Sequence, residues 1–460
     1  MKAIAIDLGS SFVKYAIFEL ENGMILNQKK ITSIPKRNAQ DRLVFEIPVM
    51  GIVKQVKEIL AQETQRYDDI GAMIFSTQMH GFVYRTEGEQ EPVYVSWQDM
   101  RCLHQRKTGE TYLEYLQGLF SKEDMKECGV YIKPSLGLCN LFTMLDENPA
   151  RPRNGTLYTL GSFVIEQLTG NNICHITNAA PLGLADVTRH CWSEKIIKRA
   201  GFDEIKFPKI AESDFSSCGV YEVNGSKLQV FPDYGDQQIA VLGSMSAAGE
   251  GLINIATAGQ VSVIAEEFQA GDFENRPYFE KLYLRTISNM PSGRGLDVLV
   301  RFAADTVERL TNKQMGIGEF WKILEKQFEP DTKGIQVDMS FYETPWKLDG
   351  GEIRGIKPGN LNLNTLFSAA FRDMAETYKK NLDILSQNTP LKAVVCSGGV
   401  SWKRPELIRV IQTVMGCPCR LSALDDEAVA GLYRMALCCS GLYKSLADQG
   451  EQVLKIQNME

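Results

Sequence analysis

The sequence has little of what marks a membrane, nucleic-acid or metal-binding protein. It has only 4 histidines among 460 residues, no apolar run of membrane-spanning length and no recognisable signal peptide. Its formal net charge of -7 argues against general binding to nucleic acids or anionic membranes, although one local basic site is enough for an anionic ligand. We therefore expect a cytoplasmic protein without nucleic-acid or membrane partners.

The cysteines give no sign of a disulfide framework or a zinc site. Many of the 11 cysteines lie in apolar surroundings, as Cys396 and Cys438 do, which favours buried thiols in a reducing compartment. Cys417 and Cys419 could begin a metal site, but no histidine is near them in the sequence. Structural zinc is therefore not expected.

The sequence also lacks the G-x-x-x-x-G-K-[ST] run of Walker-type nucleotide sites. Instead, an apolar run ends in Asp7, and the small residues Gly9, Ser10 and Ser11 separate it from a second apolar run that contains Lys14. The pattern predicts two strands joined by a turn whose N–H groups and hydroxyls can approach a phosphate. A tight hairpin with a solvated aspartate and a solvent-facing lysine explains the same residues, and both interpretations stay open.

A similar strand–turn–strand pattern returns in the second half of the chain. Residues 252–256 and 261–265 are apolar, and the turn between them contains Thr257 and Gly259. Two such hairpins facing each other would hold a phosphate chain from both sides. The alternative is that two common hairpins resemble each other by chance.

Other predicted elements follow from periodicity and turn residues. In chain order they are a three-stranded meander turned at Asn22-Gly23, a helix over residues 49–60, a strand over 70–75, a mostly helical region over 105–170, a turn over 232–235, a helix after Asp236, and a long amphipathic helix over 366–385. A strand over 393–396 then leads to Gly398 and Gly399. A glycine pair between a strand and a helix suits close packing of backbone against a flat ring such as adenine.

Seven short motifs, taken in order, resemble those of the FGGY carbohydrate kinases of the actin–hexokinase–chaperone superfamily. They are residues 7–14 (first phosphate loop), 76–81 (S-G-Q-M-H-G of xylulose kinases), 97–101 (W-x-D-x-R), 168–170 with 177–178 (L-T-G and T-D), 235–240 (the segment of the catalytic aspartate), 256–259 (second phosphate loop) and 397–399 (adenosine loop). The resemblance covers almost the whole chain and looks closest to the sedoheptulokinase-like branch.

The resemblance implies an α/β protein with two ribonuclease H-like (actin-like ATPase) domains, each a mixed sheet flanked by helices, and a cleft between them. Residues 1–245 would form an N-terminal domain with the first phosphate loop, the sugar site and the catalytic aspartate. Residues 246–460 would form a C-terminal domain with the second phosphate loop and the adenosine site. The expected activity is ATP-dependent phosphorylation of a primary hydroxyl of a ketose, with sedoheptulose as the first candidate and xylulose as the second.

The resemblance also assigns roles to individual residues. Asp236 is the expected base, with an N-capping aspartate as the alternative interpretation and Asp233 as the alternative base. The expected ligand contacts are Asp7, Gly9, Ser10, Ser11, Lys14, Thr257 and Gly259 with the ATP phosphates, Gly398 and Gly399 with adenosine, Gln78, Met79, His80, Asp236 and Gln237 with the sugar, and Asp7 with Mg²⁺ through water. Sugar and ATP are the expected partners, and a homodimer is a candidate assembly.

The chain departs from the family pattern in three places. Thr77 stands where glycine is usual, residues 400–405 replace G-A-x-x-N-P, and Ala258 stands where serine is common. These departures motivate a second hypothesis, a non-catalytic sugar or nucleotide sensor on the same fold. Trp97, Asp99 and Arg101 could line the sugar pocket, or the acid–base pair could brace its own loop.

Overall fold

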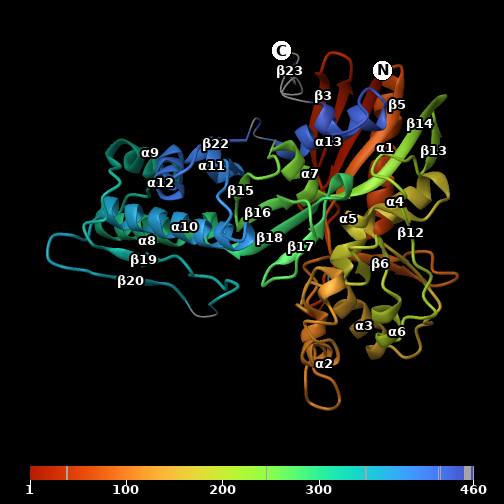
Figure 1. Cartoon of the computed structure of the whole chain (residues 1–460), viewed down its shortest axis with the longest axis horizontal. Helices are drawn as coiled ribbons and strands as arrows, with labels where there is room; N and C mark the ends of the chain where they lie inside the picture. The colour runs from red at the N-terminus through yellow and green to blue at the C-terminus, as the bar shows by residue number, and fades with distance from the viewer. Residues whose placement is uncertain are drawn as a thin grey trace. The chain divides into compact units, whose positions relative to one another are not determined.

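The computed structural model describes residues 1–37, 40–244, 246–347, 350–422, 424 and 426–449, and the backbone of 457–458. The chain forms two compact units (Figure 1). The first contains residues 1–243, 267–283 and 428–460, and the second contains 244–266 and 284–427. Residue 245, where the predicted domain boundary falls, lies outside the described residues. Within the described ranges, none of the helices is long and apolar enough to cross a bilayer.

The main sheet of the first unit is mixed, with the strand order β13-β14-β5-β1-β2-β3-β23. Its strands are β1 (Lys2–Leu8), β2 (Phe12–Glu19), β3 (Met24–Thr32), β5 (Ile70–Thr77), β13 (Gly219–Val223), β14 (Ser226–Gly235) and β23 (Gln457–Asn458). Strands β1, β2 and β3 pair antiparallel, so the predicted N-terminal meander is confirmed. Strand β5 pairs parallel with both β1 and β14.

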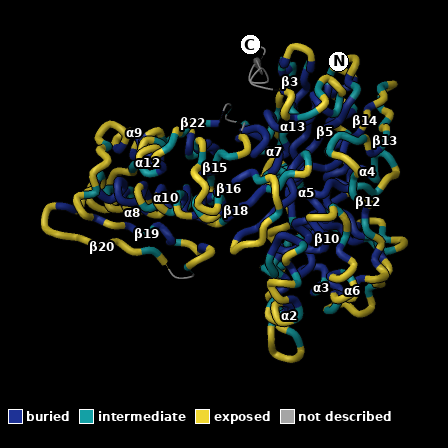
Figure 2. Tube along the Cα trace, viewed as in Figure 1, coloured by how far each residue is buried: buried dark blue, intermediate teal, exposed yellow. Residues whose placement is uncertain are grey.

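Helices cover both faces of this sheet, as the alternation of its side chains requires. Ile4 and Ile6 belong to a core cluster with α1 (Val49–Arg66) and α4 (Leu160–Thr169). The other face meets α7 (Asp236–Gly243) and α13 (Glu427–Cys439), where Phe18 of β2 packs edge-on against Tyr433 of α13. Both faces of the central strands are therefore buried (Figure 2).

A second, four-stranded sheet of the first unit has the order β4-β7-β6-β8. Its strands are β4 (Glu46–Pro48), β6 (Phe82–Arg85), β7 (Val93–Val95) and β8 (Thr156–Tyr158), and its core includes α3 (Gly137–Glu147) and parts of α2 (Tyr112–Leu119) and α6 (Glu194–Arg199). Of these strands only β8 lies within 105–170; the other regular elements of that region are helices, including α2, α3 and α4, so the predicted helices are present, with loops between them. Prolines such as Pro134 and Pro152 separate its helices, because proline cannot donate an intrahelical hydrogen bond.

The prediction of a turn over 232–235 is wrong, because β14 continues through these residues to Gly235. The pairing of β14 with β5 shifts register between Val230 and Asp233. Pro232 lies in that irregularity, where its missing N–H leaves no gap in the ladder. Smaller elements complete the unit: β9 (Ile173–Cys174), α5 (Ile176–Ala179), β10 (Ala185–Asp186), β11 (Cys191–Trp192), β12 (Lys209–Ile210) and β17 (Glu274–Pro277).

The second unit contains the consecutive sheet strands β18 (Tyr283–Met290), β16 (Gly259–Ala265), β15 (Gly251–Ile255), β21 (Val394–Ser397) and β22 (Cys419–Leu421). The predicted second hairpin is confirmed, since β15 and β16 pair antiparallel. Its helices are α8 (Gly293–Thr311), α9 (Ile317–Gln327), α10 (Leu363–Leu385), α11 (Gly399–Lys403) and α12 (Pro405–Met415). Helix α10 is the predicted long amphipathic helix, and α12 begins at Pro405 and ends before Gly416.

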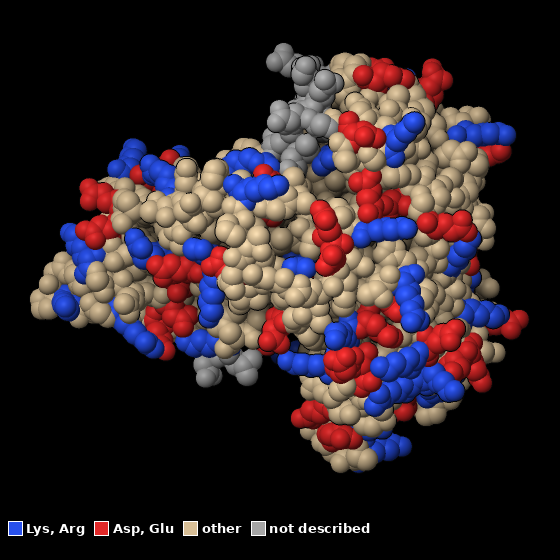
Figure 3. Space-filling view, in the orientation of Figure 1, with Lys and Arg blue, Asp and Glu red and all other residues tan. Residues whose placement is uncertain are grey.

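Charged side chains of both signs are interspersed over the surface (Figure 3). Neighbours on the helices pair at i,i+4 spacing, as Arg309 and Asp305 do at 2.8 Å and Lys379 and Asp383 do at 3.0 Å. Each exposed pair contributes little to stability. On the described part of the face in view, basic side chains form no continuous stripe.

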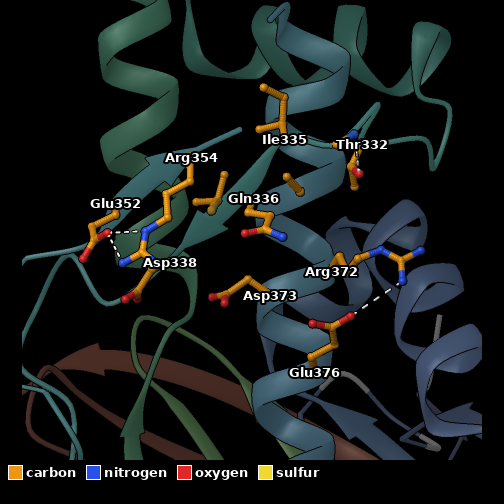
Figure 4. Close-up of a pocket in the computed structure, with 12 residues that line it drawn as sticks. Thr332, Ile335, Gln336, Asp338, Glu352, Arg354, Arg372, Asp373 and Glu376 are labelled. Carbon is orange, nitrogen blue, oxygen red and sulfur yellow. Dashed lines mark hydrogen bonds and ion pairs between the residues drawn. The ribbon is translucent and has the colours of Figure 1, made fainter. Parts of the chain in front are cut away.

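The second unit also has a cavity of about 410 Å³ between α10 and the hairpin of β19 (Gln336–Asp338) and β20 (Glu352–Arg354) (Figure 4). Its arginines pair within the lining, Arg354 with Glu352 and Arg372 with Glu376, the latter at 3.6 Å. None of the site residues predicted from the sequence lines this cavity.

The close packing of α4 on β14 gives a test of the fold. A Cβ on Gly161 would lie 2.0 Å from Cβ of Asp233, so Gly161→Ala forces the helix away from the strand. We expect a loss of about 1–3 kcal/mol in the free energy of unfolding, measured by urea denaturation.

Gly118→Ala is the matched control, because a Cβ on Gly118 of α2 meets no atom within 4 Å. There the substitution should leave stability unchanged or raise it by up to about 1 kcal/mol, the helix preference for alanine. Equal effects of the two substitutions would contradict the packing described.

Candidate functional site

Three parallel strands of the first unit end at one edge of the main sheet. Asp7 of β1 is opposite Ser76 of β5, and Gly235 of β14 is opposite Thr77 of β5. The segments that follow these strands therefore leave the sheet side by side, as ligand-binding segments do in parallel sheets. This register brings together the first phosphate hairpin, Gln78 to His80, and Asp236.

Asp7 is buried on the sheet face that meets α7. Its Oδ1 accepts a hydrogen bond from Ser76 Oγ at 2.8 Å. Lys14 is directly opposite Asp7 on β2, so their side chains share a face of the antiparallel pair. The register thus places the Cα atoms of an aspartate and a lysine opposite each other at the base of the hairpin.

The hairpin turn itself presents Ser10 and Ser11 to solvent. Gly9 is required by a close approach, because a Cβ there would lie 2.8 Å from the carbonyl oxygen of Phe12. The Gly9 carbonyl accepts a hydrogen bond from Ser33 Oγ at 2.8 Å, which fixes the turn. The predicted phosphate residues of the first unit therefore form one compact group.

Asp236 is the first residue of α7, immediately after β14. Its Oδ1 accepts a hydrogen bond at 2.8 Å from the N–H of Gln237, the next residue, whereas a capping side chain accepts from the second or third residue after it. Burial and, less strongly, the negative charge of Asp7 raise the pKa of Asp236 to about 7, against the opposing effects of the N–H of Gln237 and the guanidinium of Arg276. The carboxyl is therefore poised to exchange a proton near neutral pH.

Asp233, the alternative base, has a different environment. Its Oδ2 accepts from Thr159 Oγ1 at 2.6 Å and from Asn178 Nδ2 at 3.1 Å, and its Oδ1 accepts from the N–H of His175 at 2.7 Å. Burial raises its pKa to about 6, and these donors oppose the rise. Asp233 therefore ties β14 to the starts of α4 and α5.

The three residues after β5 were predicted to contact a sugar. A Cβ on Gly235 would lie 3.1 Å from Met79 Sδ, so Met79 lies beside the start of α7. His80 Nδ1 lies 3.0 Å from the carbonyl oxygen of Pro181, and because a carbonyl only accepts, Nδ1 carries the proton. Burial, with Lys133 and Arg276 nearby, holds the pKa of His80 well below its usual value, so its Nε2 is an acceptor.

Three buried oxygen atoms at this edge have no hydrogen-bond partner among the described residues: Gln78 Oε1, Tyr94 Oη and Gln238 Oε1, the last of which would lie 2.4 Å from a Cβ on Gly235. Burial raises the pKa of Tyr94, and the charge of Asp236 raises it further, which places the two side chains near each other. Sequence reasoning missed Tyr94, because it lies inside an ordinary strand pattern with no motif around it.

Sequence reasoning also missed a buried charged network on β17. Arg276 Nε and Nη2 donate to Glu274 Oε2 at 2.8 and 2.6 Å, and Arg276 Nη1 donates to Gln237 Oε1. Lys133 Nζ donates to the other oxygen of Glu274. The segment 267–283 lies beyond the predicted boundary of the N-terminal domain, yet it belongs to the first unit.

In the second unit, Thr257 and Gly259 lie on the turn between β15 and β16. The start of α8 holds this turn, because Ser292 Oγ donates to the carbonyl of Ala256 at 2.8 Å and the N–H of Arg294 donates to the carbonyl of Thr257 at 3.1 Å. Thr257 remains exposed, while Gly259 is buried against the carbonyl of Pro291.

The glycine pair lies beside the same turn. Gly398 has a φ of 83°, and a Cβ there would lie 2.7 Å from the carbonyl oxygen of Ile255. Its N–H donates to Glu427 Oε1 at 3.1 Å. Gly399 begins α11, and a Cβ there would meet no atom within 4 Å. The structure therefore brings Thr257, Gly259, Gly398 and Gly399 together within the second unit.

The segment with Trp97, Asp99 and Arg101 is braced as the structural alternative expected. Arg101 donates from Nε to Asp99 Oδ1 at 2.8 Å and from Nη2 to Glu46 Oε1 at 2.7 Å. Asp99 Oδ2 also accepts from the N–H of Phe45 at 2.7 Å. The pair therefore ties this loop to β4.

Comparisons with known proteins agree with these observations. Residues 2–243 match the model of the N-terminal domain of the FGGY family of carbohydrate kinases. A glycerol kinase of Alteromonas mediterranea is 25% identical over 256 residues, which are 52% of this chain and 50% of that protein. A xylulose kinase of Lactococcus lactis is 24% identical over 297 residues, 60% of this chain and 55% of that protein.

The chain thus spans about half the length of the curated relatives it matches. The crystal structure of a gluconate kinase from Lactobacillus acidophilus superposes with a TM-score of 0.82 at 16% identity, over 98% of this chain and 91% of that one. The expected fold, with mixed sheets flanked by helices in two actin-like domains, is therefore confirmed. Because the family model matches more than half of the sequence, the chain belongs to the FGGY family of carbohydrate kinases.

Proposed function

We propose that this protein transfers the terminal phosphoryl group of ATP to a primary hydroxyl of a ketose, with Asp236 as the base. The observation that carries the proposal is the position of Asp236, which is partly buried at the shared edge of β1, β5 and β14 with a pKa of about 7. A carboxyl with that pKa can accept the proton of a sugar hydroxyl at neutral pH as the new phosphorus–oxygen bond develops.

Asp7 fits the expected role toward magnesium. Among the described residues no group of three His, Cys, Asp or Glu could hold a metal ion alone, which suits an ion held mainly by water and phosphate oxygens. The Asp7 carboxylate, oriented by Ser76, would bind such an ion from the protein side. When bound, magnesium would neutralise phosphate charge. Ser10, Ser11 and the backbone around Gly9 would donate to the phosphates, with Lys14 adding positive charge.

The sugar would lie against the segment after β5. Gln78 Oε1 and Tyr94 Oη each lack a partner among the described residues, and leaving a buried polar atom unpaired costs about 1–3 kcal/mol. Sugar hydroxyls could satisfy both atoms, and His80 Nε2 could accept one more. Met79 would supply an apolar contact for the carbon chain. This set of neutral donors and acceptors suits a polyhydroxylated, uncharged substrate.

The second phosphate contact and the adenosine would come from the second unit, through Thr257, Gly259, Gly398 and Gly399. The unusual segment after the glycine pair is well packed, since the guanidinium of Arg404 stacks on the ring of Trp321 at 3.8 Å. The sensor hypothesis rests on that segment and on Ala258 in the second phosphate loop. The partly buried position of Asp236, with a pKa near neutral, favours the kinase.

The direct test is a substrate panel with magnesium-ATP. We expect ATP-dependent phosphorylation of a ketose, with sedoheptulose and xylulose as the leading candidates and glycerol and gluconate as contrasts named after relatives of this chain. Formation of ADP is measured with a coupled assay, and the product is identified by mass spectrometry. Sugar binding by calorimetry without turnover of any sugar would instead support the sensor.

The two aspartates of β14 and α7 should respond differently to the same substitution. Asp236→Asn removes the base, so we expect kcat to fall by about 10²–10⁴ while the thermal midpoint is kept. Asp233→Asn introduces a donor among the donors of Thr159, His175 and Asn178, so we expect a lower thermal midpoint. Its activity per folded molecule should stay close to that of the unmodified protein. The reverse outcome would move the base to Asp233.

The pKa of Asp236 predicts the pH profile. Below about pH 7 the carboxyl holds a proton and cannot accept another. The value of kcat/KM should therefore fall in inverse proportion to the proton concentration. The measurement covers pH 5.5 to 9 with both substrates below saturation, so that the free enzyme is reported. A profile that stays flat down to pH 5.5 would be inconsistent with Asp236 as the base.

A further inference from the structure

We propose that Arg276 is a positioning residue for Asp236, holding the first turn of α7 and placing a fixed positive charge beside the carboxylate. This inference rests on the proposed function, because it deepens the role of the same site. Arg276 lies on β17, and only 6% of the residue is exposed. Arg276 and Glu274 belong to no motif that the sequence singled out, whereas Gln237 lies in the segment of residues 235–240.

The guanidinium is fixed in direction by its partners. Two of its nitrogens donate to one oxygen of Glu274, at 2.8 and 2.6 Å, and a third donates to Gln237 Oε1. Charge-assisted bonds of this kind fix orientation as well as adding energy, because the guanidinium is planar. The side chain therefore links β17 to the residue that follows Asp236.

Glu274 is in turn held from a separate loop. Lys133 Nζ donates to its second oxygen, so the carboxylate lies between two cations. Although burial opposes ionisation, Arg276 and Lys133 hold the pKa of Glu274 far below its usual value. The three residues carry a net charge of +1, from two cations and one anion. These three side chains therefore place a net positive charge next to the first turn of α7.

Helix α7 is tied to β17 at a second point. Gln238 Nε2 donates to the carbonyl of Pro277 at 3.1 Å. Consecutive residues of the first turn thus bond to the same strand, Gln237 to Arg276 and Gln238 to Pro277. The N–H of Gln237 also donates to Asp236 Oδ1 at 2.8 Å, so the orientation of Gln237 is transmitted to the carboxylate.

The charged and titratable groups around Asp236 come from five elements. Asp7 of β1 raises its pKa, and Arg276 of β17 lowers it. Lys14 of β2 is opposite Asp7, while His80 after β5 and Tyr94 of β7 are uncharged at neutral pH because burial disfavours their charged forms. Burial and Asp7 both favour the protonated acid, which cannot act as a base. Arg276 is the side-chain cation that opposes them.

The test compares variants of the full-length protein. Arg276→Gln removes one cation and leaves Glu274 paired with Lys133, so the remaining buried charges balance. Arg276→Lys keeps the charge. Arg434→Gln is the matched control, because Arg434 is a partly buried arginine that bonds the other end of α7, donating to the carbonyl of Leu242 at 2.9 Å.

The primary readout is the pH profile of kcat/KM. In Arg276→Gln, the ratio of kcat/KM at pH 8.5 to that at pH 6.5 should rise by about threefold or more, because the carboxyl holds its proton to higher pH. Arg276→Lys should stay near the unmodified ratio, and Arg434→Gln should leave it unchanged. An equal loss of activity at both pH values in the Arg276 variants would overturn the proposal.

A second readout separates this inference from the proposed function. The titration of the Asp236 carboxyl is followed by ¹³C NMR without substrate, with Asp236→Asn used to assign its signal. A higher titration midpoint in Arg276→Gln than in the unmodified protein supports the inference even if no sugar is phosphorylated. An unmoved midpoint refutes it, whatever the activity.

Discussion

The parallel pairing of β5 with both β1 and β14 is the constraint on which the site depends. This register places Asp7 and Asp236 at one edge of a sheet that is covered on both faces. Two carboxyl groups therefore lie at the same edge with limited access to water. Water solvates their charged forms poorly, and a negative charge on one makes ionisation of the other less favourable. The neighbouring serine, arginine and backbone N–H groups are best understood as compensation for this crowding.

The two aspartates at residues 233 and 236 illustrate how environment separates roles that composition cannot. Burial raises the pKa of both, to about 6 and about 7. Asp233 is enclosed by donors from three places in the chain, so its oxygens are committed to holding the fold together. Asp236 bonds to its own helix turn and faces a second carboxylate. One residue serves packing, and the other is suited to chemistry.

The parts of the site that could be predicted are those where local sequence decides structure. Gly9 to Ser11 and the residues after β5 follow apolar runs, and the ends of parallel strands predict where polar side chains gather. The strand through Pro232 could not be predicted, because a register irregularity in the sheet tolerates the proline. Arg276 and Tyr94 could not be found either. Their importance comes from contacts with residues distant in the sequence, on segments without a motif.

The first unit is not one continuous stretch of the sequence. The first unit is assembled from three stretches, and the stretches 267–283 and 428–460 return to it after excursions into the second. The family match ends at residue 243. It therefore stops before β17, which carries Arg276, and before α13, which packs on Phe18. A fragment cut at the end of that match would keep the proposed base but lose its cation and part of its core. Each unit is built from more than one stretch of the polypeptide. Recombination at a single point could therefore not exchange either unit as a whole.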